Sequence, residues 1–329
     1  DKRLETLKQW LSQELGFDNY QIAPASADAS FRRYFRVLHD GSSHIVMDAP
    51  PEKEDCQPFI HLSGLLDELG LHVPVIQQKD LKQGFLLLSD LGTKLYLDKL
   101  NKHSVNELYD DAIKALIKLQ VYQGNDIPDY DRTLLLNEME LFREWYLGQH
   151  LNIKLDAHQQ TMIDEAFSYL AGEALAQPKV LVHRDYHSRN LMVCEKNNPG
   201  ILDFQDAVIG PVTYDLVSLL RDCYISWPVQ QVEGWVAEYH QQASAAGILN
   251  NIELEQLLHW FNLMGIQRHL KAAGIFARLN YRDGKPGYLN DIPRTLGYVK
   301  AIAGKYPKLS EFAGFIDSIT QDMQQVVES

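Results

Sequence analysis

The sequence predicts an α+β protein of two unequal lobes, a small strand-rich N-terminal lobe and a large, mainly helical C-terminal lobe. Up to about Ser89, short segments rich in β-branched and aromatic residues alternate with Gly, Ser and Asp turns. From about Leu95 onward, the apolar residues follow a helical period almost throughout. A chain of 329 residues is long enough for two such lobes, each with its own core. We therefore expect one lobe over residues 1–92, with a hinge at its end, and another over 93–329.

The N-terminal lobe is expected to begin with a helix and continue as strands. The helix covers roughly residues 2–15, and strands follow over 20–24, 31–38 and 43–48, the last two joined by a turn at Gly41. The next helix has one apolar stripe over 55–69 and ends at Gly70. Two more strands, over 73–78 and 84–89, complete the lobe.

The C-terminal lobe is expected to consist of helices with one interruption. A helix around 105–119 is followed by helical periodicity over 133–149, 157–175, 229–245, 253–279, 292–303 and 310–327. Between Lys179 and Asp203, three short apolar segments alternate with polar loops, which is typical of strands. This strand-and-loop insert contains the polar residues that are best suited to catalysis.

Charge and cysteine content limit the class of partner. The chain has 31 Lys and Arg against 44 Asp and Glu, a formal net charge of −13, so we expect no binding to nucleic acid or anionic membranes. Cys56, Cys194 and Cys223 form no CxxC pattern, which argues against a disulfide framework or a cysteine zinc site and favours a reducing compartment. The longest apolar runs are far too short to cross a bilayer. These features predict a cytoplasmic protein, which we expect to be a monomer or a weak dimer.

The most informative segment is VLVHRDYHSRNLMV, followed by GILDFQDAVIGPVTYDL. His183, Arg184 and Asp185 follow an apolar strand, Asn190 comes five residues after Asp185, and Asp203 follows another apolar strand. Phosphoryl transfer needs a carboxylate that orients and deprotonates the attacking hydroxyl, and an Asn and an Asp that hold Mg²⁺ against a triphosphate. The spacing matches the kinase pattern H-R-D-x-x-x-x-N. It predicts Asp185 as the catalytic carboxylate and Asn190 and Asp203 as metal ligands.

Simpler interpretations exist for each residue taken alone, since Asp and Asn commonly form turns or cap helices. The joint occurrence at this spacing, each residue after an apolar strand, favours the catalytic interpretation. His183 and His187 are four residues apart, which would suit a zinc site on a helix, but the segment predicts a strand and a loop, and no third ligand is evident. We expect His183 to be structural and to brace the loop through hydrogen bonds.

These motifs resemble those of the aminoglycoside phosphotransferase and choline kinase superfamily, the small-molecule branch of the protein-kinase-like fold. The family pattern appears at His183, Asp185 and Asn190, at Asp203 with Phe204, and as Gly-Pro-x-x-Tyr-Asp-Leu at 210–216. The resemblance covers nearly the whole chain and implies a protein-kinase-like two-lobe fold with ATP and Mg²⁺ as cofactors. It implies that residues 1–92 bind the nucleotide and that 93–329 carry the catalytic loop and the substrate site. Asp215, within the last motif, is expected to be structural at the site.

Three further segments, over 25–37, 46–56 and 265–294, resemble the bacterial kinases of N-acetylmuramate and N-acetylglucosamine that serve cell-wall recycling. Those enzymes phosphorylate the anomeric hydroxyl, so the resemblance implies transfer to C1 of either sugar. An aminoglycoside, which would suit an acidic protein, or a choline-type alcohol stays open as the acceptor. A nucleotide-binding scaffold without catalysis is the alternative from another class.

The N-terminal lobe departs from the kinase pattern where the phosphates would bind. The loop at 26–30 has no Gly, and the third strand has no Lys. The nearest cations, Arg32 and Arg33, are expected on opposite faces of a strand, so at most one would reach the phosphates, and two solvated charges are the alternative. The residues expected to bind the nucleotide lie at the loop exit, on the third strand and at the hinge: Ser30, Phe31, Arg32, Arg33, Met47, Ser89, Asp90 and Leu91. An apolar edge strand explains the hinge segment equally well.

A basic group, Arg268, His269 and Lys271, is unusual in this acidic chain. On a helix, Arg268 and Lys271 share a face. We predict that these three residues bind the substrate, with Arg268 the first candidate for the lactyl carboxylate of N-acetylmuramate. A solvated helix face is the alternative.

Overall fold

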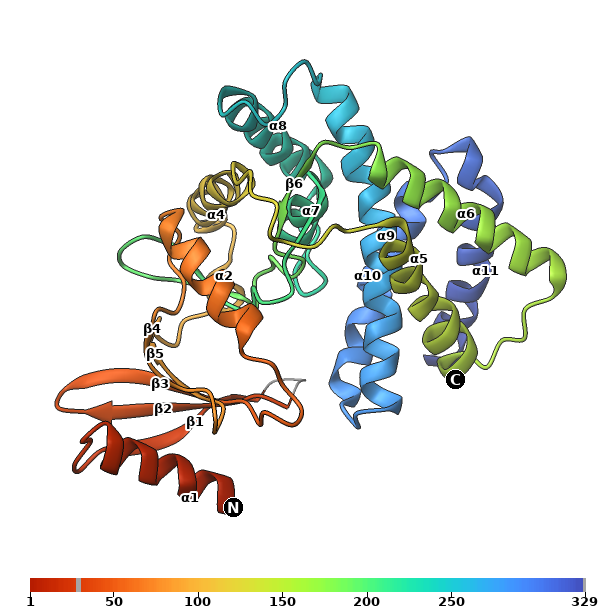
Figure 1. Cartoon of the computed structure of the whole chain (residues 1–329). Helices are drawn as coiled ribbons and strands as arrows, with labels where there is room; N and C mark the ends of the chain where they lie inside the picture. The colour runs from red at the N-terminus through yellow and green to blue at the C-terminus, as the bar shows by residue number, and fades with distance from the viewer. Residues whose placement is uncertain (28–30, 328–329) are drawn as a thin grey trace. The chain divides into compact units, whose positions relative to one another are not determined.

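The computed structural model describes residues 1–27 and 31–327, which divide into two compact units (Figure 1). Unit 1 comprises residues 1–96 and 190–206, and unit 2 comprises residues 97–189 and 207–329. The division differs from the expected one, 1–92 and 93–329, because a segment from the middle of the sequence belongs to unit 1. Within the described ranges, no helix is both long enough and apolar enough to span a membrane.

Unit 1 is built on a five-stranded antiparallel sheet in the order β1-β2-β3-β5-β4. Its strands are β1 (Gln21–Ala27), β2 (Arg33–His39), β3 (Ser42–Asp48), β4 (Ile76–Asp80) and β5 (Phe85–Ser89). Asp40 and Gly41, with φ of 47° and 74°, form the two-residue turn between β2 and β3. Two central residues with positive φ match the twist of paired strands, which explains the Asp-Gly sequence at this hairpin.

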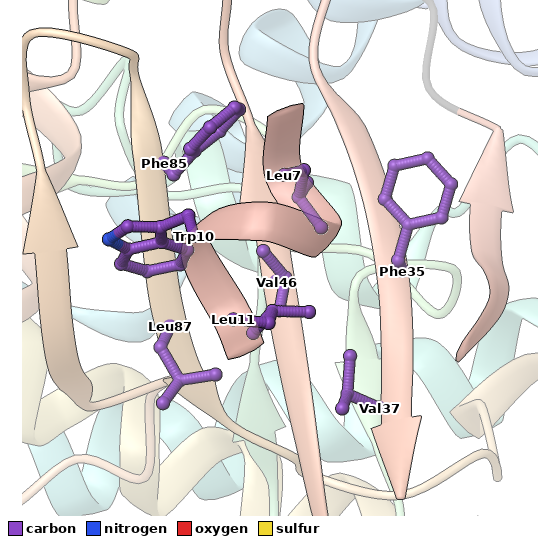
Figure 2. Packing of buried hydrophobic residues seen from close by; sticks show 8 residues of the cluster. All are labelled: Leu7, Trp10, Leu11, Phe35, Val37, Val46, Phe85 and Leu87. Atoms are coloured by element: carbon purple, nitrogen blue, oxygen red, sulfur yellow. The ribbon is translucent and has the colours of Figure 1, made fainter. Parts of the chain in front are cut away.

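The first helix covers one face of this sheet. The helix α1 (Lys2–Gln9) continues as a π-helical turn, η1 (Trp10–Glu14). Figure 2 shows its apolar residues over the strands, in a cluster of buried side chains: Leu7, Trp10, Leu11, Phe35, Val37, Val46, Phe85 and Leu87. Because successive side chains of a strand point to opposite faces, Met47 lies on the face away from α1.

A hairpin from the middle of the sequence joins unit 1 through backbone hydrogen bonds. The hairpin consists of β7 (Leu191–Met192) and β8 (Gly200–Ile201). The N–H of Val193 donates to the carbonyl of Lys94, and that of Ile201 to the carbonyl of His72, both at 2.7 Å. Its packing is close, since a Cβ added to Gly200 would lie 3.0 Å from the side chain of Leu91. These contacts explain why 190–206 belong to unit 1.

Helix α2 (Gln57–Glu68) adds an apolar contact to the segment that follows this hairpin. The ring of Phe59 lies 5.0 Å from that of Phe204, centre to centre. Both residues are buried. The residue that follows Asp203 is therefore fixed by packing inside unit 1.

Unit 2 is mainly helical and is organised around α9 (Leu254–Tyr281), which packs against α5, α6, α7 and α10 (Figure 1). The other helices are α3 (Tyr96–Lys99), α4 (Val105–Gln120), α5 (Arg132–Leu141), η2 (Phe142–His150), α6 (Ala157–Leu175), α7 (Tyr214–Leu220), α8 (Val229–Ala245), η3 (Pro286–Asp291), α10 (Ile292–Ala303), η4 (Pro307–Leu309) and α11 (Ser310–Val327). Two short strands, β6 (Lys179–Val182) and β9 (Val208–Pro211), pair antiparallel. The expected helices are thus present, and β6 leads into the loop that contains Asp185.

Helices α5 and α9 approach each other closely at Gly274. A Cβ added there would lie 2.3 Å from the carbonyl carbon of Leu141, a backbone atom that cannot move aside cheaply. Gly234 in α8 is the matched control, because a Cβ there would meet no atom within 4 Å.

We predict that Gly274→Ala lowers the free energy of unfolding by about 1–3 kcal/mol or more, the usual range for overpacking. Gly234→Ala should instead raise it by up to about 1 kcal/mol, because alanine favours a helix. Urea unfolding followed by circular dichroism measures both. A midpoint for Gly274→Ala at or above that of the wild type would show that Gly274 is not needed for the approach of α9 to α5.

Candidate active site

The loop that carries Asp185 begins where β6 ends, and Asp215 fixes its first residues. Asp215 is fully buried in the first turn of α7. Its carboxylate oxygens accept the N–H of His183 at 2.6 Å and that of Arg184 at 3.0 Å. Arg184 has a φ of 78°, a left-handed conformation that costs a non-glycine residue about 1–2 kcal/mol. The two hydrogen bonds hold this strained turn in place immediately before Asp185.

Asp185 is ionised because of the charges around it. Burial raises the pKa of Asp185, but the charge of Lys271, followed by those of His187 and Arg268, outweighs burial and lowers it to about 2. Its N–H donates to Nδ1 of His183 at 3.2 Å, so the buried His183 ring contacts the loop that it belongs to. A carboxylate with so low a pKa is a weak proton acceptor, but it can accept a hydrogen bond from a hydroxyl and orient it.

Glu138 of α5 balances the cations around Asp185, and the sequence analysis missed it. Glu138 is buried, and its carboxylate accepts hydrogen bonds from Nζ of Lys271 at 2.8 Å and from the guanidinium of Arg184. Burial raises the pKa of Glu138, but these two cations lower it below its usual value. Nζ of Lys271 also donates to the hydroxyl of Tyr214 at 2.9 Å. In the sequence, Glu138 is a charged residue on the apolar stripe of the helix expected over 133–149, and this could have indicated a buried ion pair.

A second missed carboxylate, Asp222, holds the later part of the loop. Ser188 donates to Asp222 twice, from its N–H at 2.9 Å and from its hydroxyl at 2.5 Å. The N–H of Tyr224 donates to the other oxygen of Asp222 at 3.0 Å. Asp222 is buried, so these bonds join the loop firmly to the segment after α7.

Asn190 and Asp203, the two predicted metal ligands, lie together in unit 1. Nδ2 of Asn190 donates to Oδ2 of Asp203 at 3.3 Å, and Nε2 of Gln205 donates to Oδ1 at 2.7 Å. The backbone is also joined, since the N–H of Leu202 donates to the carbonyl of Asn190 at 2.9 Å. Asp203 has a φ of 65°, a second left-handed non-glycine residue in this region. Local strain of this kind is common at functional sites.

The chemistry of Asn190 and Asp203 fits a hard divalent cation. Mg²⁺ prefers oxygen ligands, keeps several waters, and is usually held by one or two protein side chains together with phosphates. One amide directly before β7 and one carboxylate shortly after β8 supply such a pair. Within residues 1–27 and 31–327, no group of three or more His, Cys, Asp or Glu is gathered as in an all-protein metal cage.

Arg32 lies directly before β2, and Arg33 is the first residue of that strand; the two side chains have different partners. The guanidinium of Arg32 pairs with Glu54 at 3.1 Å, and its side chain is 11% exposed. Burial lowers the pKa of Arg32, but the electrostatic influence of Tyr34, Glu54, Asp206 and Asp203 raises it overall. Arg33 instead pairs with Asp1 and with the buried Asp48. The alternative of two solvated charges is therefore not met, and Asp203 is one of the residues that act electrostatically on Arg32.

Glu54 also fixes the backbone at the start of β2. Its second oxygen accepts the N–H of Phe31 at 3.1 Å. The Phe31 ring is 58% exposed, and Nζ of Lys53 lies 4.3 Å from its centre. Ser30 lies outside the described residues.

The hinge residues are held mainly by their own unit. Ser89 ends β5, and its hydroxyl accepts the N–H of Val75 at 2.9 Å. The carboxylate of Asp90 pairs with Arg36 at 2.6 Å and accepts the N–H of Gly92 at 2.9 Å. The remaining two predicted positions are Met47, which is buried, and Leu91, whose carbonyl accepts a bond from Sγ of Cys194 at 3.5 Å. The side chain of Asp90 therefore stabilises the turn. The groups of the hinge that could bind a ligand are those of its backbone.

The basic group on α9 is buried, so the solvated-face alternative is wrong. Arg268 and Lys271 are 5% and 7% exposed, and His269 is fully buried. Nε2 of His269 lies 2.8 Å from the carbonyl of Arg221, and burial lowers the pKa of His269 to about 3, which makes it a neutral packing residue. We expected His269 to bind the substrate, but its side chain is buried in the packing of α9. Among the residues that the structure describes, the hydrogen bond of Arg268 is a long one, 3.7 Å to Sγ of Cys223.

Comparisons with known proteins show the family to which the chain is similar. Residues 21–249 match the family described as "Phosphotransferase enzyme family". The chain is 48% identical to a protein from Pseudomonas putida and 40% identical to one from Neisseria meningitidis, each over 96% of both chains, and both are named N-acetylmuramate/N-acetylglucosamine kinase.

Solved structures show the same fold at low sequence identity. A choline kinase from Streptococcus pneumoniae superposes with a TM-score of 0.65 at 13% identity, covering 92% of this chain and 100% of that one. A gentamicin complex of the aminoglycoside phosphotransferase APH(2")-IIa superposes with a TM-score of 0.61 at 14% identity, covering 88% and 95%. The resemblance inferred from the motifs and the two-lobe α+β fold class are thereby confirmed. The chain belongs to the phosphotransferase enzyme family.

Proposed function

We propose that this protein is an ATP-dependent kinase that phosphorylates the anomeric hydroxyl of N-acetylmuramate and N-acetylglucosamine. The observation that carries the proposal is the near full-length similarity to relatives named for these two sugars. The presence of Asp185, Asn190 and Asp203 at the family's motif positions supports an active enzyme. We place the reaction in the cytoplasm, as part of cell-wall sugar recycling, and expect a monomer or weak dimer that binds neither nucleic acid nor membrane.

In this proposal, unit 1 binds ATP. Asn190 and Asp203 would hold Mg²⁺, which neutralises charge on the β- and γ-phosphates when bound. Arg32, held by Glu54, would take the place of the absent third-strand lysine, since a guanidinium binds phosphate oxygens through two N–H groups. Arg33 is committed to Asp48 on the other face, and we assign it no phosphate contact.

The adenine side would be formed by the hinge and its neighbours. The backbone from Ser89 through Asp90 to Leu91 would bond the base, and Met47 would supply an apolar surface. Phe31 would contact the nucleotide, and Ser30, which lies outside the described residues, is proposed to bind it as well. The exposed Phe31 ring next to a fixed N–H supports this role.

The acceptor would bind to unit 2. Asp185 accepts the hydrogen bond of the C1 hydroxyl and directs its oxygen at the γ-phosphorus. A new P–O bond forms as the bond from the γ-phosphorus to the bridging oxygen breaks, and ADP leaves. The hydroxyl proton passes through Asp185 to the phosphate product or to water. An anomeric hydroxyl is more acidic than an ordinary alcohol, which suits a carboxylate of low pKa.

Arg268 and Lys271 would supply positive charge next to the reacting hydroxyl. Both contribute to the low pKa of Asp185. His183 and Asp215 would hold the loop, and His269 would shape the helix behind it. For this reason we propose that Arg268 and Lys271 act at the substrate site.

The alternatives are weaker. The similarity to solved aminoglycoside phosphotransferases and to choline and ethanolamine kinases is only 12–15% in sequence identity. It therefore supports the fold and not the choice of substrate. A non-catalytic scaffold would hydrolyse or transfer nothing in response to sugar. Turnover of ATP that depends on an added acceptor, compared among amino sugars, aminoglycosides and choline, distinguishes all three ideas.

The metal assignment predicts that Asp203→Ala weakens binding of MgATP much more than binding of metal-free ATP. The reason is that Asp203 would act on the nucleotide through the cation. Titration calorimetry with and without EDTA measures both affinities, and circular dichroism checks the fold. Equal losses in the two titrations would remove Asp203 from the metal site.

The position of transfer gives a second prediction. The 1-O-methyl glycoside of N-acetylglucosamine has no free C1 hydroxyl, so it should not be phosphorylated, whereas the free sugar should be. Transfer from γ-labelled ATP, followed by mass spectrometry of the product, measures this. Phosphorylation of the glycoside at the rate of the free sugar would place the transfer on another hydroxyl.

A further inference from the structure

Arg189, in the loop that carries Asp185, lies against two aromatic rings. Arg189 comes four residues after Asp185 and directly before Asn190. Its guanidinium carbon lies 3.7 Å from the ring centre of Tyr224 and 5.5 Å from that of Tyr288. Among the residues that the structure describes, no hydrogen bond or ion pair engages its side chain. Arg189 therefore differs from Arg184, its neighbour in the same loop, which pairs with a carboxylate.

The aromatic support is itself held from behind. Phe276 of α9 is buried, stacks on Tyr288 at 5.7 Å and 22°, and lies 6.1 Å from Tyr224. The ring of His187 meets Tyr224 edge-on at 5.3 Å. A guanidinium that lies against rings in this way has its plane fixed, while the N–H groups at its edge point away from the rings.

The backbone under Arg189 is equally fixed. Ser188 and Tyr224 donate to the same buried carboxylate, Asp222. One residue thus anchors both the loop and the ring on which Arg189 lies. A charged fork prepared in this way is suited to a planar anion, which it can bind through two parallel hydrogen bonds.

Arg268, the first candidate from the sequence, is placed differently. Its side chain is almost fully buried, its bond is to a thiol, and its charge acts on Asp185. A cation there influences the reacting hydroxyl of any acceptor, with or without a carboxylate. Arg189 is the partly exposed member of the pair.

We propose that Arg189 is a specificity-determining residue that binds a carboxylate on the acceptor and so favours N-acetylmuramate over N-acetylglucosamine. This inference rests on the proposed function and adds the residue that distinguishes the two sugars. The same fork could bind a phosphate of the nucleotide, and the experiment separates these two anions.

The test compares kcat/KM for the two sugars, and KM for MgATP, in Arg189→Ala, Arg189→Lys and Arg268→Ala. Arg189→Ala should lower kcat/KM for N-acetylmuramate roughly 10- to 100-fold more than that for N-acetylglucosamine, the size expected for charge-assisted hydrogen bonds. Arg189→Lys keeps the charge without the planar fork and should show a smaller selective loss. Arg268→Ala should reduce both sugars by similar factors. Arg282→Ala, which removes an exposed cation at the end of α9, is the matched control and should leave the ratio unchanged.

Three results would overturn the assignment. Equal losses for both sugars in Arg189→Ala, with a raised KM for MgATP, would make Arg189 a phosphate ligand. A selective loss in Arg268→Ala but not in Arg189→Ala would return the carboxylate to Arg268. A wild-type enzyme that phosphorylates neither sugar would reject the proposed function, and this inference with it. Arg189→Lys and circular dichroism guard against a folding defect in the alanine variant.

Discussion

The hydrogen bonds from two backbone N–H groups to Asp215 determine where the loop that carries Asp185 begins. His183 and Arg184 leave β6 in a conformation that no helix or strand stabilises, and Arg184 has a left-handed φ. Buried N–H groups without an acceptor cost about 1–3 kcal/mol each, and the strain adds to that cost. Asp215 satisfies both groups, so the chain turns sharply just before Asp185. The position of Asp185 in unit 2 depends on this contact.

The charged residues around the loop that carries Asp185 alternate in sign from one to the next. Glu138 binds Lys271 and Arg184, and Lys271 in turn lowers the pKa of Asp185. Removing one member would leave another charge buried without compensation, which is far more costly than losing an exposed pair. This order also keeps Asp185 ionised throughout the neutral range, because its pKa of about 2 lies well below neutrality. A carboxylate that is ionised near neutral pH can orient a hydroxyl and accept its proton transiently, and orientation is the main demand of phosphoryl transfer.

Local patterns in the sequence predicted the parts that depend on neighbouring residues. The strand periods, the spacing of Asp185 and Asn190, and the motif around Asp215 all lie within short segments. Pairings across long separations could not be predicted in this way. Glu138 meets Lys271 because α5 packs on α9, Glu54 meets Arg32 beyond the first hairpin, and a central hairpin joins unit 1 through backbone bonds. Periodicity reports which face is buried, but not which partner a buried charge will find.

The central claim is that Asp185 orients the acceptor hydroxyl while other residues bind the nucleotide. Asp185→Asn keeps the size of the side chain and removes its charge, so turnover at saturating sugar and MgATP measures this claim most directly. The account predicts a fall in kcat of about 10²-fold or more, the usual scale for such groups, with the affinity for MgATP retained in calorimetry. Turnover like that of the wild type would contradict it.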